Sequence, residues 1–282
     1  MILFNTRSAE HLAEKMNIQR GKIDFTRFAD GEFRITVKED VAGKIVWVLA
    51  STEAPAENWL ELFFLLDVLK NQGAIINLLI TYFGYARQDH PENNEAAAAQ
   101  FLAEKLEQFN LNKILILHPH STRLHNWLTY TEIIPYDLYI PIALESDVII
   151  APDKGAKTFV STLAKECKRD YIILEKSRID DKTVRLDDLP INIKDKKILV
   201  ADDMISTGST LIAATELLWK YRPINICAIA THGLFIDSAK QKIESSYLED
   251  VFVTNSLPNQ FGKSCKIELL NLTNFLERYL IG

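Results

Sequence analysis

Short apolar runs rich in β-branched residues alternate with longer amphipathic segments along most of the chain. An uninterrupted or alternating apolar run predicts a strand, and apolar positions that recur with the helical period predict a helix. The runs predict strands at Ile23–Phe28, Glu32–Val37, Ile45–Ser51, Ala74–Thr81, Lys113–Leu117, Val148–Ala151, Tyr171–Leu174, Lys197–Ala201, Ile224–Thr231 and Val251–Thr254. The amphipathic segments predict helices at Ala9–Met16, Asn58–Asn71, Ala96–Phe109, Lys157–Cys167, Thr210–Tyr221, Ile236–Ser245 and Thr273–Leu280.

This alternation predicts an α/β fold with mainly parallel sheets flanked by helices. Fully apolar strands such as Ile114–Leu117 and Ile198–Ala201 fit the centre of such a sheet, where both faces are covered. The chain has 282 residues, and its two halves show similar patterns. At roughly 100–200 residues per domain, this length predicts two domains. We place the boundary in the polar stretch Pro141–Asp147, which gives domains at 1–144 and 145–282.

Composition and charge argue against several classes of protein. Hydrophobic residues make up 48% of the chain, and the formal net charge of −6 argues against a protein that coats nucleic acid. An acidic protein can still bind anionic substrates, because a few cations focused in a cleft suffice. No apolar run approaches the roughly 18 residues of a membrane span, and the chain begins without the regions of a signal peptide. We therefore expect a soluble, cytoplasmic protein that binds neither membranes nor nucleic acid.

The three cysteines, Cys167, Cys227 and Cys265, are odd in number and widely spaced. No pair has the short spacing of a zinc site or of a redox motif. They are therefore expected to be free thiols in a reducing compartment.

The segment Ile198–Thr210 is the most specific element of the sequence. An apolar strand ends in two acids, Asp202 and Asp203, and a Ser-Thr-Gly-Ser-Thr turn leads into an alanine-rich helix. Ligands of open α/β sheets bind beyond the carboxyl ends of the strands, and backbone N–H groups at a helix N-terminus hold anions. A plain capped turn with two solvated acids is the alternative, but the pattern favours a site for a sugar phosphate. It is not a Walker A motif, because no Gly-Lys-Ser/Thr follows the strand.

The pattern Asp-Asp-x-x-x-Thr-Gly-x-Thr resembles the phosphoribosyl-diphosphate loop shared by phosphoribosyltransferases and ribose-phosphate pyrophosphokinases. Further segments resemble motifs of the second family, in the form of its shorter, archaeal-type branch, and occur in the same order: Phe28–Glu32, Tyr82–Asp89, Ala151–Ala156, Leu174–Arg178 and Val253–Ser256. The resemblance spans nearly the whole chain. It implies two similar phosphoribosyltransferase-like domains, with the last helix returning to the first domain.

The resemblance also implies an activity. Members of this family transfer a diphosphate group from Mg-ATP to the anomeric hydroxyl of ribose 5-phosphate, giving phosphoribosyl diphosphate and AMP. They need Mg²⁺, and a loop of one subunit reaches the ATP site of its neighbour. We therefore expect a homo-oligomer, at least a dimer, with ATP and ribose 5-phosphate as substrates.

Residue by residue, the resemblance predicts a binding site for each substrate. An aromatic face can stack on adenine, carboxylates can accept hydrogen bonds from it, and a planar guanidinium suits phosphate oxygens. The ATP site is predicted to comprise Phe28, Asp30, Glu32, Arg87, Gln88 and Asp89. The ribose-phosphate site is predicted to comprise Asp202, Asp203, Ser206, Thr207, Gly208, Ser209 and Thr210.

Metal and catalytic residues follow from the same resemblance. His120 and Asp153 match the metal-site positions of the family, although Mg²⁺ generally prefers oxygen ligands. Lys176 and Arg178 match cations that neutralise the charge on the β-phosphate and the leaving AMP, and we expect their loop to close over the triphosphate. His118 is given no role, and His232 is a candidate for lining the sugar site.

The segment His90–Ala99 departs from the family pattern, because the basic residues common there are missing. This places regulatory binding of phosphate or nucleotide in doubt. Two alternatives to the synthetase stay open at this point. One is a phosphoribosyltransferase of salvage metabolism, which would have no use for the ATP motifs, and the other is a non-catalytic protein associated with a synthetase.

Overall fold

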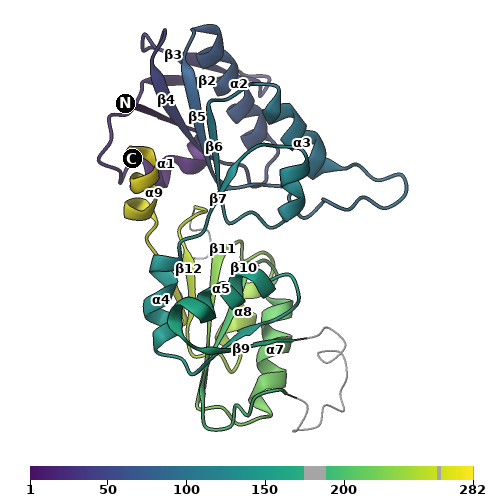
Figure 1. Cartoon of the computed structure of the whole chain (residues 1–282). Coiled ribbons are helices and arrows are strands. Elements are labelled where there is room, and N and C mark those ends of the chain that lie inside the picture. Colours follow the sequence, from purple (N-terminus) through teal and green to yellow (C-terminus); the bar gives the residue numbers. More distant parts are fainter. Residues whose placement is uncertain (175–188, 259–261, 282) are drawn as a thin grey trace. The chain divides into compact units, whose positions relative to one another are not determined.

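The computed structural model describes residues 1–174, 189–258 and 262–281 (Figure 1). The chain forms two compact units. The first contains Met1–Ile134, Ser256–Pro258 and Leu272–Gly282, and the second contains Pro135–Asn255 and Asn259–Asn271. This division falls before helix α4 (Tyr136–Leu144), whereas the boundary expected from the sequence falls directly after it.

The first unit is built on a parallel sheet. Within the described residues this sheet has five strands in the order β1-β4-β5-β6-β7. Their bounds are Ile2–Asn5, Ile45–Ser51, Ile75–Tyr82, Lys113–Leu117 and Thr131–Ile133. The central strands β4 and β5 are buried almost throughout, as their continuous apolar sequences require.

Helices cover this sheet. They are α1 (Glu10–Ala13), α2 (Glu57–Asn71), α3 (Ala98–Glu107) and α9 (Thr273–Ile281). Helix α2 buries Trp59, Leu62, Leu65, Leu66 and Leu69, an apolar stripe with helical spacing. The C-terminal helix α9 lies in the first unit, near α1 in Figure 1, where Glu277 accepts a 2.5 Å hydrogen bond from the backbone N–H of Asn17.

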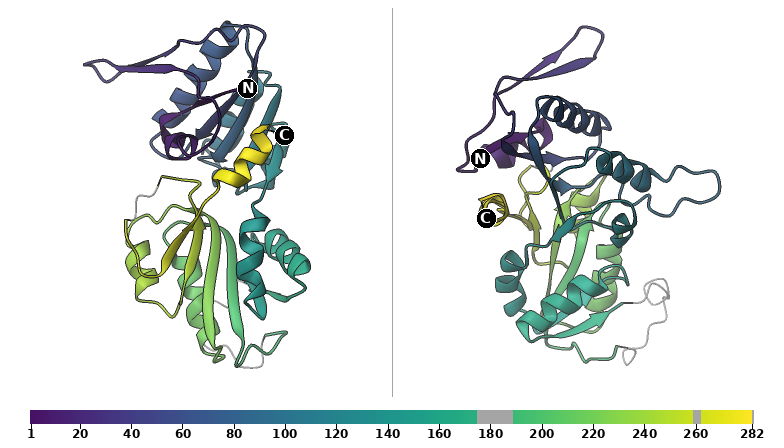
Figure 2. Two further views of the ribbon diagram at one scale, coloured as in Figure 1. Left: turned by 90° about the vertical axis from the view of Figure 1, so that its left-hand side faces the viewer. Right: turned by 45° about the horizontal axis from the view of Figure 1, so that its top comes forward.

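A separate hairpin belongs to the first unit. Strands β2 (Ile23–Arg27) and β3 (Phe33–Val37) pair antiparallel and form their own two-stranded sheet among the described residues. Figure 2 shows this hairpin projecting from the rest of the unit. Both strands were predicted, but their place outside the parallel sheet was not.

The second unit is also built on a parallel sheet. In its described part the strand order is β13-β12-β11-β10-β8-β9. In chain order the strands are β8 (Val148–Ala151), β9 (Asp170–Ile173), β10 (Lys197–Ile205), β11 (Asn225–Gly233), β12 (Val251–Thr254) and β13 (Ile267–Leu270). The helices in the described part of this unit are α4, α5 (Lys157–Cys167), α7 (Ser209–Trp219) and α8 (Ala239–Glu244).

The predicted fold class is confirmed: both units are mainly parallel sheets flanked by helices. Sequence patterns missed the short strands β1, β7 and β13, and also α4, which contains Pro141. The first helix was predicted too long. Only Glu10–Ala13 is α-helical, after a short 3-10 turn at Arg7–Ala9. In residues 1–174, 189–258 and 262–281, none of the helices combines the length and apolar character needed to cross a membrane.

Candidate functional site

The turn after β10 in the second unit has the form that anion binding requires. Strand β10 ends at Ile205, and Gly208 is the residue that caps the start of α7. Gly208 has φ +73°, a left-handed conformation that other residues adopt only with strain. The hydroxyls of Thr207 and Ser209 lie 3.1 Å apart, and the side chains of Ser209 and Thr210 are exposed. Hydroxyls and the N–H groups at the start of α7 therefore lie at one turn, an arrangement that suits an anion.

Three carboxylates interact at the same edge of the second sheet. Asp202 and Asp203 lie near the end of β10, and the backbone N–H of Asp203 donates to Asp202 Oδ1 at 2.9 Å. Burial, followed by the charges of Asp203 and Asp153, raises the pKa of Asp202 well above its ordinary value. Asp153 follows β8 and accepts a 2.8 Å hydrogen bond from the N–H of Gly155. Mutual repulsion of this kind is relieved when a cation binds.

Thr231 of strand β11, which pairs with β10, belongs to a buried polar cluster that sequence reasoning missed. Tyr139 on α4 is fully buried, and its hydroxyl lies 2.8 Å from Thr231 Oγ1. The Thr254 hydroxyl donates to the carbonyl of Thr231 at 2.6 Å. Thr231 precedes His232, which is buried and lies opposite Met204 of β10. No motif marked Tyr139, because a lone tyrosine in an apolar helix resembles any other core residue.

In the first unit, the predicted adenine-binding residues Phe28, Asp30 and Glu32 lie at the tip of the hairpin. All three are exposed. The backbone closes a tight turn, in which the N–H of Phe28 donates to the Glu32 carbonyl at 2.8 Å. Asp30 Oδ1 accepts from the N–H of Glu32 at 3.0 Å, and Gly31 has φ +93°. The motif is therefore a hydrogen-bonded turn that presents an aromatic ring and two carboxylates to solvent.

The segment after β5 is fixed by close backbone packing. A side chain at Gly84 would come within 1.9 Å of the Thr52 carbonyl oxygen, so only glycine fits. Beyond it, Arg87 and Gln88 are exposed. Asp89 is largely covered and contacts Ser121 Oγ at 2.5 Å and His90 Nδ1 at 3.0 Å. Burial opposes ionisation of Asp89, but these hydrogen bonds outweigh it and lower the pKa of the carboxyl.

The two histidines after β6 have different surroundings. His118 is buried at φ +39°, and its backbone N–H donates to the Ile133 carbonyl. His120 is exposed. The bond between Asp89 and Ser121 brings the segments after β5 and β6 together, so Arg87 and His120 belong to one edge of the first sheet.

Other predicted groupings stay predictions. His120 lies in the first unit and Asp153 in the second. Lys176 and Arg178 lie outside the described residues. Within the described parts of the chain, no group of three or more histidine, cysteine or acidic side chains is arranged to hold a metal ion.

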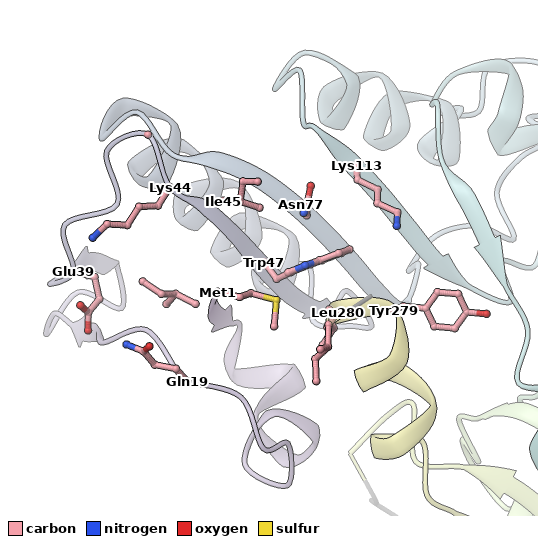
Figure 3. A pocket seen from close by; sticks show the side chains of 13 residues that line it. Met1, Gln19, Glu39, Lys44, Ile45, Trp47, Asn77, Lys113, Tyr279 and Leu280 are labelled. Atoms are coloured by element: carbon pink, nitrogen blue, oxygen red, sulfur yellow. The ribbon is translucent and has the colours of Figure 1, made fainter.

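A separate pocket of about 940 Å³ lies in the first unit (Figure 3). It is at the opposite edge of the sheet, because its lining includes Ile45 and Lys113, the first residues of β4 and β6. The Lys113 ammonium lies 5.8 Å from the centre of the Trp47 ring. None of the predicted site residues lines this pocket.

Comparison with known proteins places these features in a family. Residues 2–109 match the N-terminal domain of ribose phosphate pyrophosphokinase, and residues 136–263 match the phosphoribosyl transferase domain. The ribose-phosphate pyrophosphokinase of Bacillus caldolyticus is 30% identical over 266 residues, which cover 90% of this chain and 83% of that protein. The chain belongs to the ribose-phosphate pyrophosphokinase family.

Further relatives agree with this assignment. The ribose-phosphate pyrophosphokinase of Mycoplasma genitalium is 30% identical over 288 residues, covering 96% of this chain and 86% of that protein. The crystal structure of phosphoribosylpyrophosphate synthetase from Mycobacterium smegmatis has the same fold, with a TM-score of 0.87 and 24% identity over 99% of this chain and 97% of that one. The family resemblance inferred from the motifs is therefore confirmed.

Proposed function

We propose that this chain transfers the diphosphate group of Mg-ATP to the anomeric hydroxyl of ribose 5-phosphate, releasing AMP. The observation that carries the proposal is the turn after β10, which joins two acids, a left-handed Gly208 and a helix start. This arrangement occurs in a chain that matches ribose-phosphate pyrophosphokinases over most of their length.

The 5-phosphate of the sugar binds at the turn of residues 206–210. The N–H groups at the start of α7 and the hydroxyls of Thr207, Ser209 and Thr210 supply donors to its oxygens. Asp202 and Asp203 precede this turn on β10, where carboxylates can accept hydrogen bonds from the ribose hydroxyls.

Carboxylate oxygens are the ligands that Mg²⁺ prefers. Asp153 supplies hard oxygen donors, and burial, followed by the charges of Asp203 and Asp153, raises the pKa of Asp202, so a cation nearby would favour its ionised form. We assign His120 and Asp153 to the metal. Bound Mg²⁺ would neutralise phosphate charge.

ATP binds through two sets of residues. Phe28 stacks on adenine, while Asp30 and Glu32 accept hydrogen bonds, and this turn comes from a second copy of the chain. Arg87 and Gln88 contact the phosphates from the exposed segment after β5. Asp89 is held by Ser121 and His90, which favours a role in fixing that segment. The active protein is therefore an oligomer, at least a dimer, and we place it in the cytoplasm.

Catalysis consists of positioning and charge stabilisation. The anomeric oxygen attacks the β-phosphorus in line, the bond from that phosphorus to the α-phosphate oxygen breaks, and AMP leaves. Lys176 and Arg178 stabilise negative charge that grows on the transferred group and on the leaving AMP. No covalent enzyme intermediate is needed.

The direct test is AMP formation by the purified chain, which should require ATP, Mg²⁺ and ribose 5-phosphate together. A chain that makes a nucleotide from a base and phosphoribosyl diphosphate without ATP would be a phosphoribosyltransferase. Absence of both activities would assign it a non-catalytic role beside another synthetase.

A further inference from the structure

The hairpin that carries Phe28, Asp30 and Glu32 has little support of its own. Its two strands pair only with each other among the described residues, and an isolated two-stranded hairpin is marginally stable in water. Figure 2 shows it extending away from the parallel sheet of its unit. The position of the turn at its tip therefore depends on contacts between the hairpin and the rest of its unit.

Arg27 joins the turn to helix α2. Its Nη1 donates to the carbonyl of Gly31 inside the turn at 2.8 Å, and its Nη2 donates to Glu57 Oε1 on α2. The guanidinium carbon lies 5.7 Å from the centre of the Phe25 ring and 5.9 Å from that of Phe33. A planar, forked cation can make these contacts at once, and a lysine ammonium cannot.

Glu57 is in turn held by Arg7. Arg7 Nη2 lies 2.9 Å from Glu57 Oε1, and Arg7 Nε lies 2.8 Å from Glu61 Oε2. Glu61 is only 4% exposed, so it anchors the network in the protein. Hydrogen bonds from Arg27 and then Arg7 lower the pKa of Glu57, which keeps it charged. A continuous chain of charged contacts thus runs from α2 to Gly31.

Aromatic packing places the turn end of the hairpin on the same helix. The rings of Phe25 and Phe33 stack at 5.1 Å, and Phe33 contacts Phe64 of α2 at 5.2 Å. Arg7 lies over the Phe25 ring at 3.5 Å. Phe25 and Phe33 lie beside Arg27 at the turn end of the strands, and Arg27 contacts both α2 and the turn.

We propose that Glu57 and Arg27 are positioning residues, which hold the adenine-binding turn in place for ATP without touching ATP themselves. The turn is closed by its own hydrogen bonds at Phe28, Gly31 and Glu32, so it moves as one body. The hydrogen bond between Arg27 and Glu57 sets where the turn lies relative to α2. This inference rests on the proposed ATP-binding role of the turn.

The consequence is specific to one substrate. If the turn keeps its own structure but loses its fixed position, it binds ATP more weakly in both the ground state and the transition state. Loss of such uniform binding raises KM and leaves kcat unchanged. The sugar site is built on β10 and α7 and contains no part of the hairpin. KM for ribose 5-phosphate should therefore stay constant.

The test compares Glu57→Gln and Arg27→Lys with Asp24→Asn. Asp24 forms an exposed ion pair with Lys38 at 2.9 Å in the same hairpin, far along the strands from the turn, and is the matched control. The dissociation constant for Mg-ATP, measured by calorimetry, and KM for ATP should rise about tenfold in the first two variants. Asp24→Asn should leave both constants as in the wild type.

A double variant, Arg27→Lys with Glu57→Gln, tests whether the two residues act through each other. Coupled residues give a double variant no worse than the worse single variant, and independent residues give multiplied effects. Unchanged ATP affinity in both single variants, an equal loss in Asp24→Asn, or multiplied effects would overturn the proposal. Because ATP binding is measured without turnover, a wild-type chain that binds ATP but forms no AMP would contradict the proposed function alone.

Discussion

Asp202 belongs to the proposed sugar site, but its burial beside other carboxylates opposes its ionised form. In the folded chain its pKa is raised by burial and by the charges of Asp203 and Asp153. Such a group favours folding most below its ordinary pKa, and this contribution is lost as the pH rises through the raised value. As the pH rises above the ordinary pKa of aspartic acid, Asp202 therefore lowers the free energy of unfolding when no metal is bound.

The prediction concerns Asp202→Asn. This variant should melt at a higher temperature than the wild type at pH 7 without Mg²⁺, because the amide has no ionised form that burial and the neighbouring carboxylates oppose. The difference should shrink when Mg²⁺ is added, and also below the ordinary pKa of aspartic acid. Its kcat/KM should fall roughly tenfold or more, since the ribose contact is impaired. Thermal unfolding across pH decides the matter, and a variant less stable than the wild type at pH 7 would show that the carboxylates do not repel.

Lys176 lies outside the described residues, so its role rests on family resemblance and on the chemistry of diphosphate transfer. Lys176→Ala should lower kcat by roughly 100-fold, or about 2.7 kcal/mol, because charge that grows in the transition state loses its partner. KM for ribose 5-phosphate should change little, since the sugar phosphate binds at the separate turn of residues 206–210. Steady-state kinetics with each substrate varied distinguishes this from a binding defect, which would appear in that KM alone.

At the scale of elements, sequence patterns predicted most reliably those strands and turns whose structure is set by their own residues. The apolar runs of β4, β6 and β10 read as buried parallel strands, and the turn before α7 was predicted from its residue types alone. Patterns could not show that β2 and β3 leave the sheet, because both strands have the same local character inside or outside it. They also missed Arg27, Glu57 and Tyr139, whose partners are distant in sequence.

At the scale of the whole molecule, the proposed sharing of the ATP site between copies makes a prediction about mixed oligomers. Phe28→Ala impairs the turn, and Asp203→Asn impairs the sugar site. When the two variants are co-expressed, a mixed pair contains one site with an intact turn and intact acids. Random pairing into dimers should restore about a quarter of the wild-type activity. Activity no higher than the average of the two single variants would show that each chain supplies its own turn.

The central claim is that the β-phosphorus of ATP, with the γ-phosphate attached, moves to the sugar. The most direct measurement uses ATP labelled at the β-phosphorus, incubated with the purified chain, Mg²⁺ and ribose 5-phosphate. The label should appear in phosphoribosyl diphosphate, with an equal amount of unlabelled AMP and no ADP. Label in ADP, or label still in ATP after long incubation with folded protein, would contradict the account.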